Sequence, residues 1–82
     1  MKNELIRAID LALDGSWEQA HNIVQQDESG VAAWIHAVLH KIEGDVSNSR
    51  YWYQRAGKME KTAAEPRAEL AEIKNQLAGD VG

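Results

Sequence analysis

The stretch at residues 34–57, WIHAVLHKIEGDVSNSRYWYQRAG, decides the fold. Its apolar residues recur every three or four positions on both sides of Gly44, a spacing typical of amphipathic helices. Gly44 suits the left-handed conformation that ends a helix, and Asp45 or Ser47 can cap the helix that follows. The stretch therefore predicts two helices joined by a tight turn, over residues 31–43 and 46–56.

The same kind of pattern continues outward from this stretch. It predicts three further helices, over residues 3–14, 16–26 and 65–78. The glycines expected at helix boundaries are Gly15, Gly30, Gly44, Gly57 and Gly79. Ser16 and Gln19 form a capping-box pattern, and Pro66 suits the first turn of the last helix. We therefore expect one all-α domain over residues 1–82, with two antiparallel hairpins (3–26 and 31–56) and a C-terminal capping helix (65–78).

The two expected hairpins are internal copies of each other. When the second is shifted by 29 residues, Gly15 falls on Gly44 and the small residue Ala20 falls on Ser49. A small residue five positions after the glycine lets the two helices of a hairpin approach closely. Repeats in this length range are typical of helical solenoids.

On these residues the chain resembles the tetratricopeptide and Sel1-like helical repeats. Residues 34–56 carry the large aromatic that opens such a repeat, then a Gly-Asp turn, a small residue, an aromatic pair and an alanine. Residues 48–57 are similar to the second helix of a Sel1-like unit, and residues 5–27 resemble a degenerate copy. The chain also resembles a group of short, uncharacterised bacterial proteins. The resemblance implies a fold built from helical hairpins and no assigned activity.

The composition excludes several classes of function. The 82 residues have a net charge of −4 and include no cysteine, which rules out disulfides, thiolate metal sites and cysteine nucleophiles. A net acidic chain is a poor default binder of nucleic acid. The sequence contains no phosphate-binding glycine loop and no nucleophile elbow, so we expect neither an enzyme nor a cofactor. No apolar run has the length of a signal peptide or a membrane span, and we expect a cytoplasmic protein without membrane contact.

One pattern in the expected third helix suits a metal ion. His36, His40 and Glu43 stand at i, i+4 and i+7, so one helical face presents all three, and two imidazoles one turn apart suit zinc. His21 would have to join them from another helix. In the structural interpretation, both histidines flank the apolar stripe and hydrogen-bond to neighbouring groups. We expect this structural role and no bound zinc, and we keep a metal- or small-ligand-binding protein centred on His36 and His40 as the alternative.

A basic patch with an aromatic ring follows the Gly-Asp turn. This patch could dock an anion or an acidic peptide, because arginine binds carboxylates through two hydrogen bonds and tyrosine offers a stacking face. Its members are Arg50, Tyr51, Arg55, Lys58 and Lys61. The alternative is the solvated side of a helix. Three adjacent aromatics cannot share one face, so we expect Tyr51 at the surface. The aromatics expected in the core are Trp17, Trp34, Trp52 and Tyr53.

The leading prediction is a protein-interaction module, which acts by self-association or by holding a segment of a partner protein. The residues expected at its interface are Ile35, His36, Leu39, His40, Arg50, Tyr51 and Arg55. We expect a homodimer, because nothing N-terminal to the first hairpin covers its apolar side. In the competing arrangement, the last helix folds back across that side within one chain. A third possible function is an anion binder that uses Arg50, Arg55 and Lys58.

Overall fold

A computed structural model describes residues 2–79, and every regular element in that range is helical. The elements, in order, are α1 (Lys2–Leu13), α2 (Trp17–Val24), α3 (Gly30–Glu43), α4 (Val46–Ala56), the 3-10 turn η1 (Met59–Lys61) and α5 (Pro66–Gly79). The all-α prediction is confirmed, and each expected helix is present within two residues of its expected bounds. None of these helices is both long and apolar enough to cross a bilayer.

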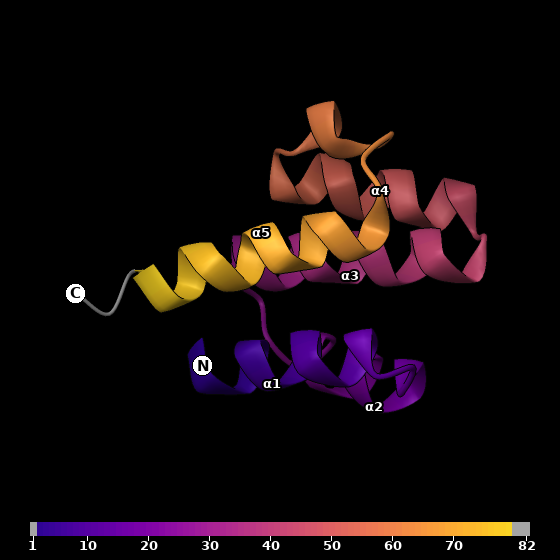
Figure 1. Ribbon diagram of the computed structural model, residues 1–82. Coiled ribbons are helices and arrows are strands. Elements are labelled where there is room, and N and C mark those ends of the chain that lie inside the picture. Colours follow the sequence, from indigo (N-terminus) through magenta and orange to yellow (C-terminus); the bar gives the residue numbers. More distant parts are fainter. Residues whose placement is uncertain (1, 80–82) are drawn as a thin grey trace.

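The central element of the molecule is α3. It packs against α1, α2, α4 and α5, and Figure 1 shows it between α4 on one side and the α1–α2 pair on the other. Every residue from Ala32 to His40 is buried, as expected of a helix that is apolar on nearly all sides. Ile35 and Leu39 are fully buried, so their predicted place at a partner interface is wrong. The broad apolar stripe of α3 is covered by four helices of the same chain.

The turn between α3 and α4 is built as the sequence predicts. Gly44 ends α3 with a φ of 87°, in the left-handed region that residues with a Cβ rarely adopt. The carboxylate of Asp45, not the hydroxyl of Ser47, caps α4 by accepting a hydrogen bond from the backbone N–H of Asn48 at 3.3 Å. The two helices therefore follow each other after a two-residue connection and pack together.

One prediction about helix ends is wrong, since the side chain of Ser16 makes no capping hydrogen bond to α2. Gly30 and Gly79 stand at helix boundaries, as expected, as the first and last residues of their helices, and neither has a positive φ. Ser29 takes the capping position of α3, where its hydroxyl accepts from the backbone N–H of Ala32 at 3.1 Å.

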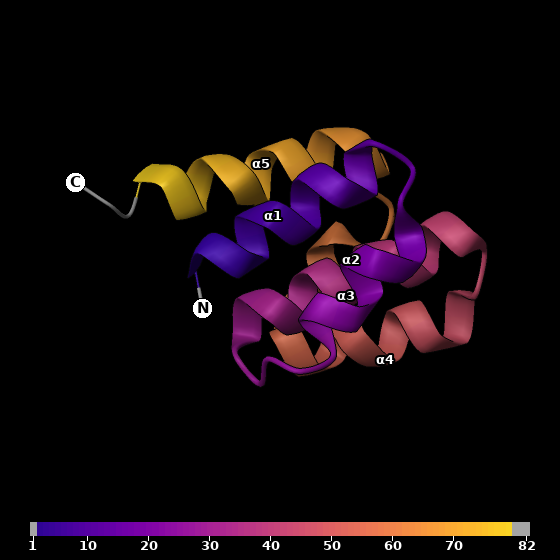
Figure 2. The same ribbon diagram turned by 90° about the horizontal axis from the view of Figure 1, so that it is seen from below.

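The last helix, α5, packs against both α1 and α3, and Figure 2 shows it lying alongside α1. The guanidinium of Arg67 donates to the carbonyl oxygen of Leu13 at 3.1 Å, which ties the start of α5 to the end of α1. Leu5, Ile9 and Val24 of the first helix pair are all buried. The homodimer prediction assumed an uncovered apolar side on this pair; α5 covers part of it, and Ile6 and Ile23 of the same pair are only partly buried. The homodimer itself stays a prediction, which sedimentation over a roughly hundredfold dilution series tests.

The close approach of α3 and α4 depends on a small residue, as the repeat pattern predicts. Ser49 is buried, and its hydroxyl donates to the carbonyl oxygen of Ala37 at 2.8 Å. Trp34 and Tyr53 are core residues, as expected. Trp17 and Trp52, also expected in the core, are only partly buried and pack against its edge. These two half-buried rings lie beside the polar cluster described next.

Candidate functional site

Three histidines from two helices converge beside α3, and we name them the histidine cluster. His21 comes from α2, while His36 and His40 lie one turn apart on α3. One ring nitrogen of each lies within 4.8 Å of the others. The Nε2 atoms of His21 and His36 are 3.0 Å apart. The fold thus brings His21 to the pair that the sequence pattern singles out.

The orientation of His40 is set by Glu43. The Oε1 atom of Glu43 lies 2.6 Å from Nδ1 of His40, so it accepts a hydrogen bond from Nδ1–H. In the neutral form of His40 that has its proton on Nδ1, the lone pair is on Nε2. A carboxylate oxygen of Asp45 also lies within 4.8 Å of His40 and Glu43. Glu43, which the sequence pattern offers as a candidate metal ligand, is therefore placed as the hydrogen-bond partner of His40.

Two indole rings wall the histidine cluster. Trp17 stacks on His21 with ring centroids 4.8 Å apart, and Trp52 stacks on His36 at 3.9 Å, with interplanar angles of 9° and 10°. The indole N–H of Trp17 donates to the carbonyl oxygen of Leu39 at 2.6 Å and so holds the ring against α3. Packing therefore sets the ring planes of His21 and His36.

Burial keeps two of these histidines uncharged at neutral pH. It lowers the pKa of His36 to about 4, and repulsion from protonated His21 and His40 acts in the same direction. Burial also lowers the pKa of His21, with a smaller contribution from His40 and an opposing one from Glu43. A neutral imidazole has one N–H donor and one nitrogen lone pair. At neutral pH the rings of His21 and His36 can therefore each accept a hydrogen bond or bind a cation.

A second polar cluster surrounds Glu69 of α5, whose side chain is buried, and we name it the Glu69 cluster. The indole N–H of Trp34 donates to Oε2 at 2.7 Å, and the hydroxyl of Tyr53 lies 2.8 Å from both carboxylate oxygens. The ammonium of Lys41 lies 2.8 Å from Oε1. Burial, with the neighbouring carboxylate, raises the pKa of Tyr53, so its hydroxyl stays protonated and donates. Side chains from α3, α4 and α5 thus meet at one carboxylate.

The ammonium of Lys41 also holds the segment that precedes α5. It donates to the carbonyl oxygens of Ala64 at 2.7 Å and Lys61 at 3.2 Å. Among the side chains that the structure describes, those of residues 3–79, no buried nitrogen or oxygen lacks a hydrogen-bond partner. The Glu69 cluster is therefore saturated, and its role is to hold α5 and the preceding segment against α3.

The Glu69 cluster is the main feature that the sequence analysis missed. A signal for it exists, because Glu69 stands four residues before Ile73 and next to Leu70, on the apolar face of its helix. A carboxylate at such a position needs a buried partner. Its donors lie 16 to 35 residues away in sequence, and no local pattern identifies them.

The exposed sides of α4 carry cations and one exposed aromatic ring. Arg50 and Arg55 are exposed, and Tyr51 is 49% exposed. The guanidinium of Arg55 lies over the rings of Tyr51 and Trp52, at 5.8 and 5.3 Å from their centroids. It also donates to the hydroxyl of Tyr51 at 3.2 Å. Arg50 and Arg55 are five residues apart, so they point to sides of the helix about 140° apart. We name the exposed surface that Arg50, Tyr51 and Arg55 occupy the α4 face.

The seven residues expected at a partner interface therefore separate into three groups. Arg50, Tyr51 and Arg55 lie at the surface, as an interface requires. His36 and His40 are 5% and 7% exposed and belong to the histidine cluster. Ile35 and Leu39 belong to the core.

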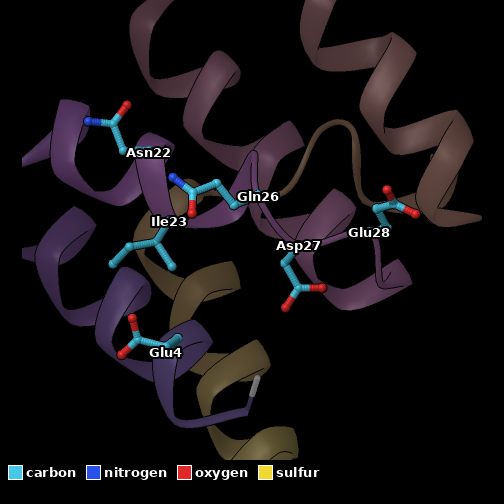
Figure 3. A pocket seen from close by; sticks show the side chains of 6 residues that line it. All are labelled: Glu4, Asn22, Ile23, Gln26, Asp27 and Glu28. Carbon is cyan, nitrogen blue, oxygen red and sulfur yellow. The ribbon is translucent and has the colours of Figure 1, made fainter.

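An acidic hollow of about 430 Å³ lies between the start of α1 and the connection from α2 to α3. Figure 3 shows its lining side chains, which are Glu4, Asn22, Ile23, Gln26, Asp27 and Glu28. Three of the six are carboxylates, and none is an imidazole or a cation. The hollow is therefore acidic, and two of its residues, Asp27 and Glu28, also line a neighbouring pocket with Arg55 of the α4 face.

Comparisons with protein-family models, with curated proteins and with solved structures find no match for the chain. The tetratricopeptide or Sel1-like resemblance of residues 5–27 and 34–56 therefore stays a prediction. The function is inferred from the contacts within the chain itself.

Proposed function

We propose that the chain is a non-catalytic protein-interaction module that binds an acidic segment of a partner protein along α4. The observation that carries the proposal is the charge of this helix. Residues 46–58 contain three cations and no acidic residue, in a chain whose net charge is −4. Complementary potential of this kind steers an oppositely charged partner to one surface and fixes its register.

The contacts of Arg55 prepare the α4 face for a carboxylate. Because the guanidinium is stacked over Tyr51 and Trp52, it loses less side-chain freedom on binding than a free arginine would. Only one of its contacts within the chain is a hydrogen bond, at 3.2 Å to the hydroxyl of Tyr51. Its other N–H groups remain available for a bidentate pair with an aspartate or glutamate side chain.

A groove beside Arg50 favours a polypeptide over a simple anion. The groove has a volume of about 260 Å³, and its lining includes Val46, Arg50, Thr62 and Ala63. Val46 is 66% exposed, so the groove offers apolar contact next to a cation. A segment with an apolar side chain near its carboxylates satisfies both features. Nucleic acid fits these features less well, because it presents a uniform row of phosphates and the 13 acidic residues of the chain would repel them.

The test is fluorescence polarisation with a labelled peptide rich in aspartate and leucine. We expect saturable binding that weakens as salt rises. The double variant Arg50→Gln with Arg55→Gln should weaken binding at least about tenfold, since two charge-assisted pairs are lost. Arg7→Gln is the matched control, because Arg7 is an exposed arginine on α1, and it should bind like the wild type.

Two results would contradict the proposal. In one, the control weakens binding as much as the double variant, which would mean that only net charge matters. In the other, a polyanion without apolar groups, such as heparin or duplex DNA, binds more tightly than the peptide. The second result would favour the anion-binding alternative through Arg50, Arg55 and Lys58.

A further inference from the structure

We propose that His21, His36 and His40 form a binding site for a divalent transition-metal ion of the zinc class. The site joins α2 to α3 and is separate from the α4 face. Its ligands would be one ring nitrogen from each histidine, and these already lie within 4.8 Å of one another. Such an ion would connect the first helix pair to the central helix.

The distance between two of the nitrogens fits a shared ion. Two imidazole nitrogens bound to zinc at about 2.0–2.1 Å with tetrahedral angles lie about 3.3–3.4 Å apart. The Nε2 atoms of His21 and His36 are 3.0 Å apart. A small rotation of one ring therefore opens the space that the ion needs. The ring nitrogen of His40 lies within 4.8 Å of both.

The protonation of this pair gives a chemical reason for the ion. At 3.0 Å, the Nε2···Nε2 contact of His21 and His36 is favourable only when one of the two nitrogens carries a proton. A cation between the lone pairs replaces that proton, which moves to Nδ1 of the same ring. Both rings stay neutral, as metal ligation requires.

The third ligand is oriented by a carboxylate. Because Nδ1 of His40 is 2.6 Å from Glu43, the lone pair that remains for an ion is on Nε2. Histidine ligands usually donate their other N–H to a carboxylate or carbonyl, which fixes the tautomer and makes the ligand more basic. Glu43 thus supplies the second contact that a histidine ligand normally has.

The donor set selects the chemical class of the ion. Imidazole nitrogens suit Zn²⁺, Co²⁺, Ni²⁺ and Cu²⁺, whereas Ca²⁺ and Mg²⁺ prefer oxygen ligands. Three histidines leave one tetrahedral position for water or for a ligand from outside the chain. The rings of Trp17 and Trp52 stack directly on two of the ligands, so their fluorescence should be quenched when Co²⁺ or Ni²⁺ binds.

The test is calorimetric titration of tag-free protein with Zn²⁺ near neutral pH, because a polyhistidine tag binds the same ions. We expect one equivalent to bind with micromolar or tighter affinity. His21→Gln should weaken binding at least about 100-fold. This variant is the one to use because His21 is less buried than His36 and His40. The control Glu18→Gln changes an exposed side chain of the same helix and should bind like the wild type.

A second measurement needs no variant. Co²⁺ bound to three imidazoles should give the strong visible absorption of a four-coordinate ion and quench tryptophan emission, whereas Co²⁺ on surface carboxylates gives only the weak spectrum of a six-coordinate ion. The proposal is overturned by the six-coordinate spectrum. It is equally overturned by titrations that do not saturate, or by His21→Gln protein of unchanged helicity that binds Zn²⁺ like the wild type. The last two results would leave the three histidines with a purely structural role.

Discussion

The Glu69 cluster and the histidine cluster differ in how completely their hydrogen-bonding groups are used. Both gather polar side chains from more than one helix beside tryptophan rings. The carboxylate of Glu69 receives hydrogen bonds from an indole, a hydroxyl and an ammonium. The histidine cluster has one hydrogen bond between the rings of His21 and His36 and one between His40 and Glu43. In neutral His40, a lone pair remains on Nε2.

This difference separates a structural role from a binding role. A saturated cluster has no lone pair or donor to offer, so it can only hold its helices together. A cluster with a spare lone pair and a proton that an ion can replace has capacity for a ligand. Burial does not separate the clusters as clearly, because His36 and His40 are 5% and 7% exposed and only His21 is partly buried.

The largest expected effect is on the Glu69 cluster. Glu69→Leu should lower the free energy of unfolding by about 3–5 kcal/mol, because Lys41 loses its anion and the donors of Trp34 and Tyr53 lose their acceptor. Urea denaturation followed by circular dichroism measures the loss. The expected loss is a large share of the roughly 5–15 kcal/mol by which a typical domain is stable.

The control for this prediction lies on the same helix. Glu72 is paired with Lys61 at 2.9 Å, and its side chain is 40% exposed. Glu72→Leu should therefore change the free energy of unfolding by less than about 1 kcal/mol. Equal losses in the two variants would show that the buried network around Glu69 has no special role.

The contrast also explains what the sequence reveals. The glycine turn at Gly44 is a local feature and is predicted correctly, and the cap at Asp45 is one of the two that the sequence offers. His36 and His40 are found because a spacing of four residues places them on one helical face. These predictions need only the geometry of a single helix.

The missed features depend on how helices meet. The approach of His21 to the histidine pair is set by packing between α2 and α3. Ile35 and Leu39 look like surplus apolar surface until α3 is known to have four neighbours. The position of α5 against α1 likewise follows from contacts between helices that are distant in sequence. A single sequence has no local pattern that encodes such contacts.

The second prediction concerns the metal-free protein in acid. The pKa of His36 falls from its ordinary value of 6.5 to about 4 in the folded state. The imidazole of His36 therefore binds its proton more tightly in the unfolded chain than in the folded protein. The stability that depends on neutral His36 is therefore fully present above about pH 6.5 and is lost as the pH falls towards 4. The shift corresponds to about 3 kcal/mol, and protonation of the neighbouring His21 acts in the same direction.

Urea denaturation at several pH values between about 7 and 4 checks this prediction. Carboxylates with lowered pKa, such as Glu65, add a further loss at the acid end of this range. His36→Gln retains those carboxylates and removes the imidazole, so its stability should fall much less. A fall as steep as that of the wild type would contradict the assigned role of His36.

The smallest expected effect tests Glu43 as the partner of a metal ligand. Glu43→Gln should weaken Zn²⁺ binding by about tenfold and retain one equivalent per chain, because the glutamine oxygen still accepts from Nδ1 of His40 without a full charge. Calorimetry measures both quantities. Unchanged affinity would show that Glu43 does not orient His40, and a loss as complete as in His21→Gln would make Glu43 a ligand itself.

The most direct test of the difference between the clusters is a Zn²⁺ titration followed by long-range ¹H–¹⁵N NMR of the ring nitrogens. We expect the Nε2 resonances of His21, His36 and His40 to move together and to stop moving at one equivalent. The indole N–H resonance of Trp34, which is bonded to Glu69 at 2.7 Å, should stay in place. Imidazole resonances that do not move, or a Trp34 resonance that moves as much as theirs, would contradict the division into a binding cluster and a structural one.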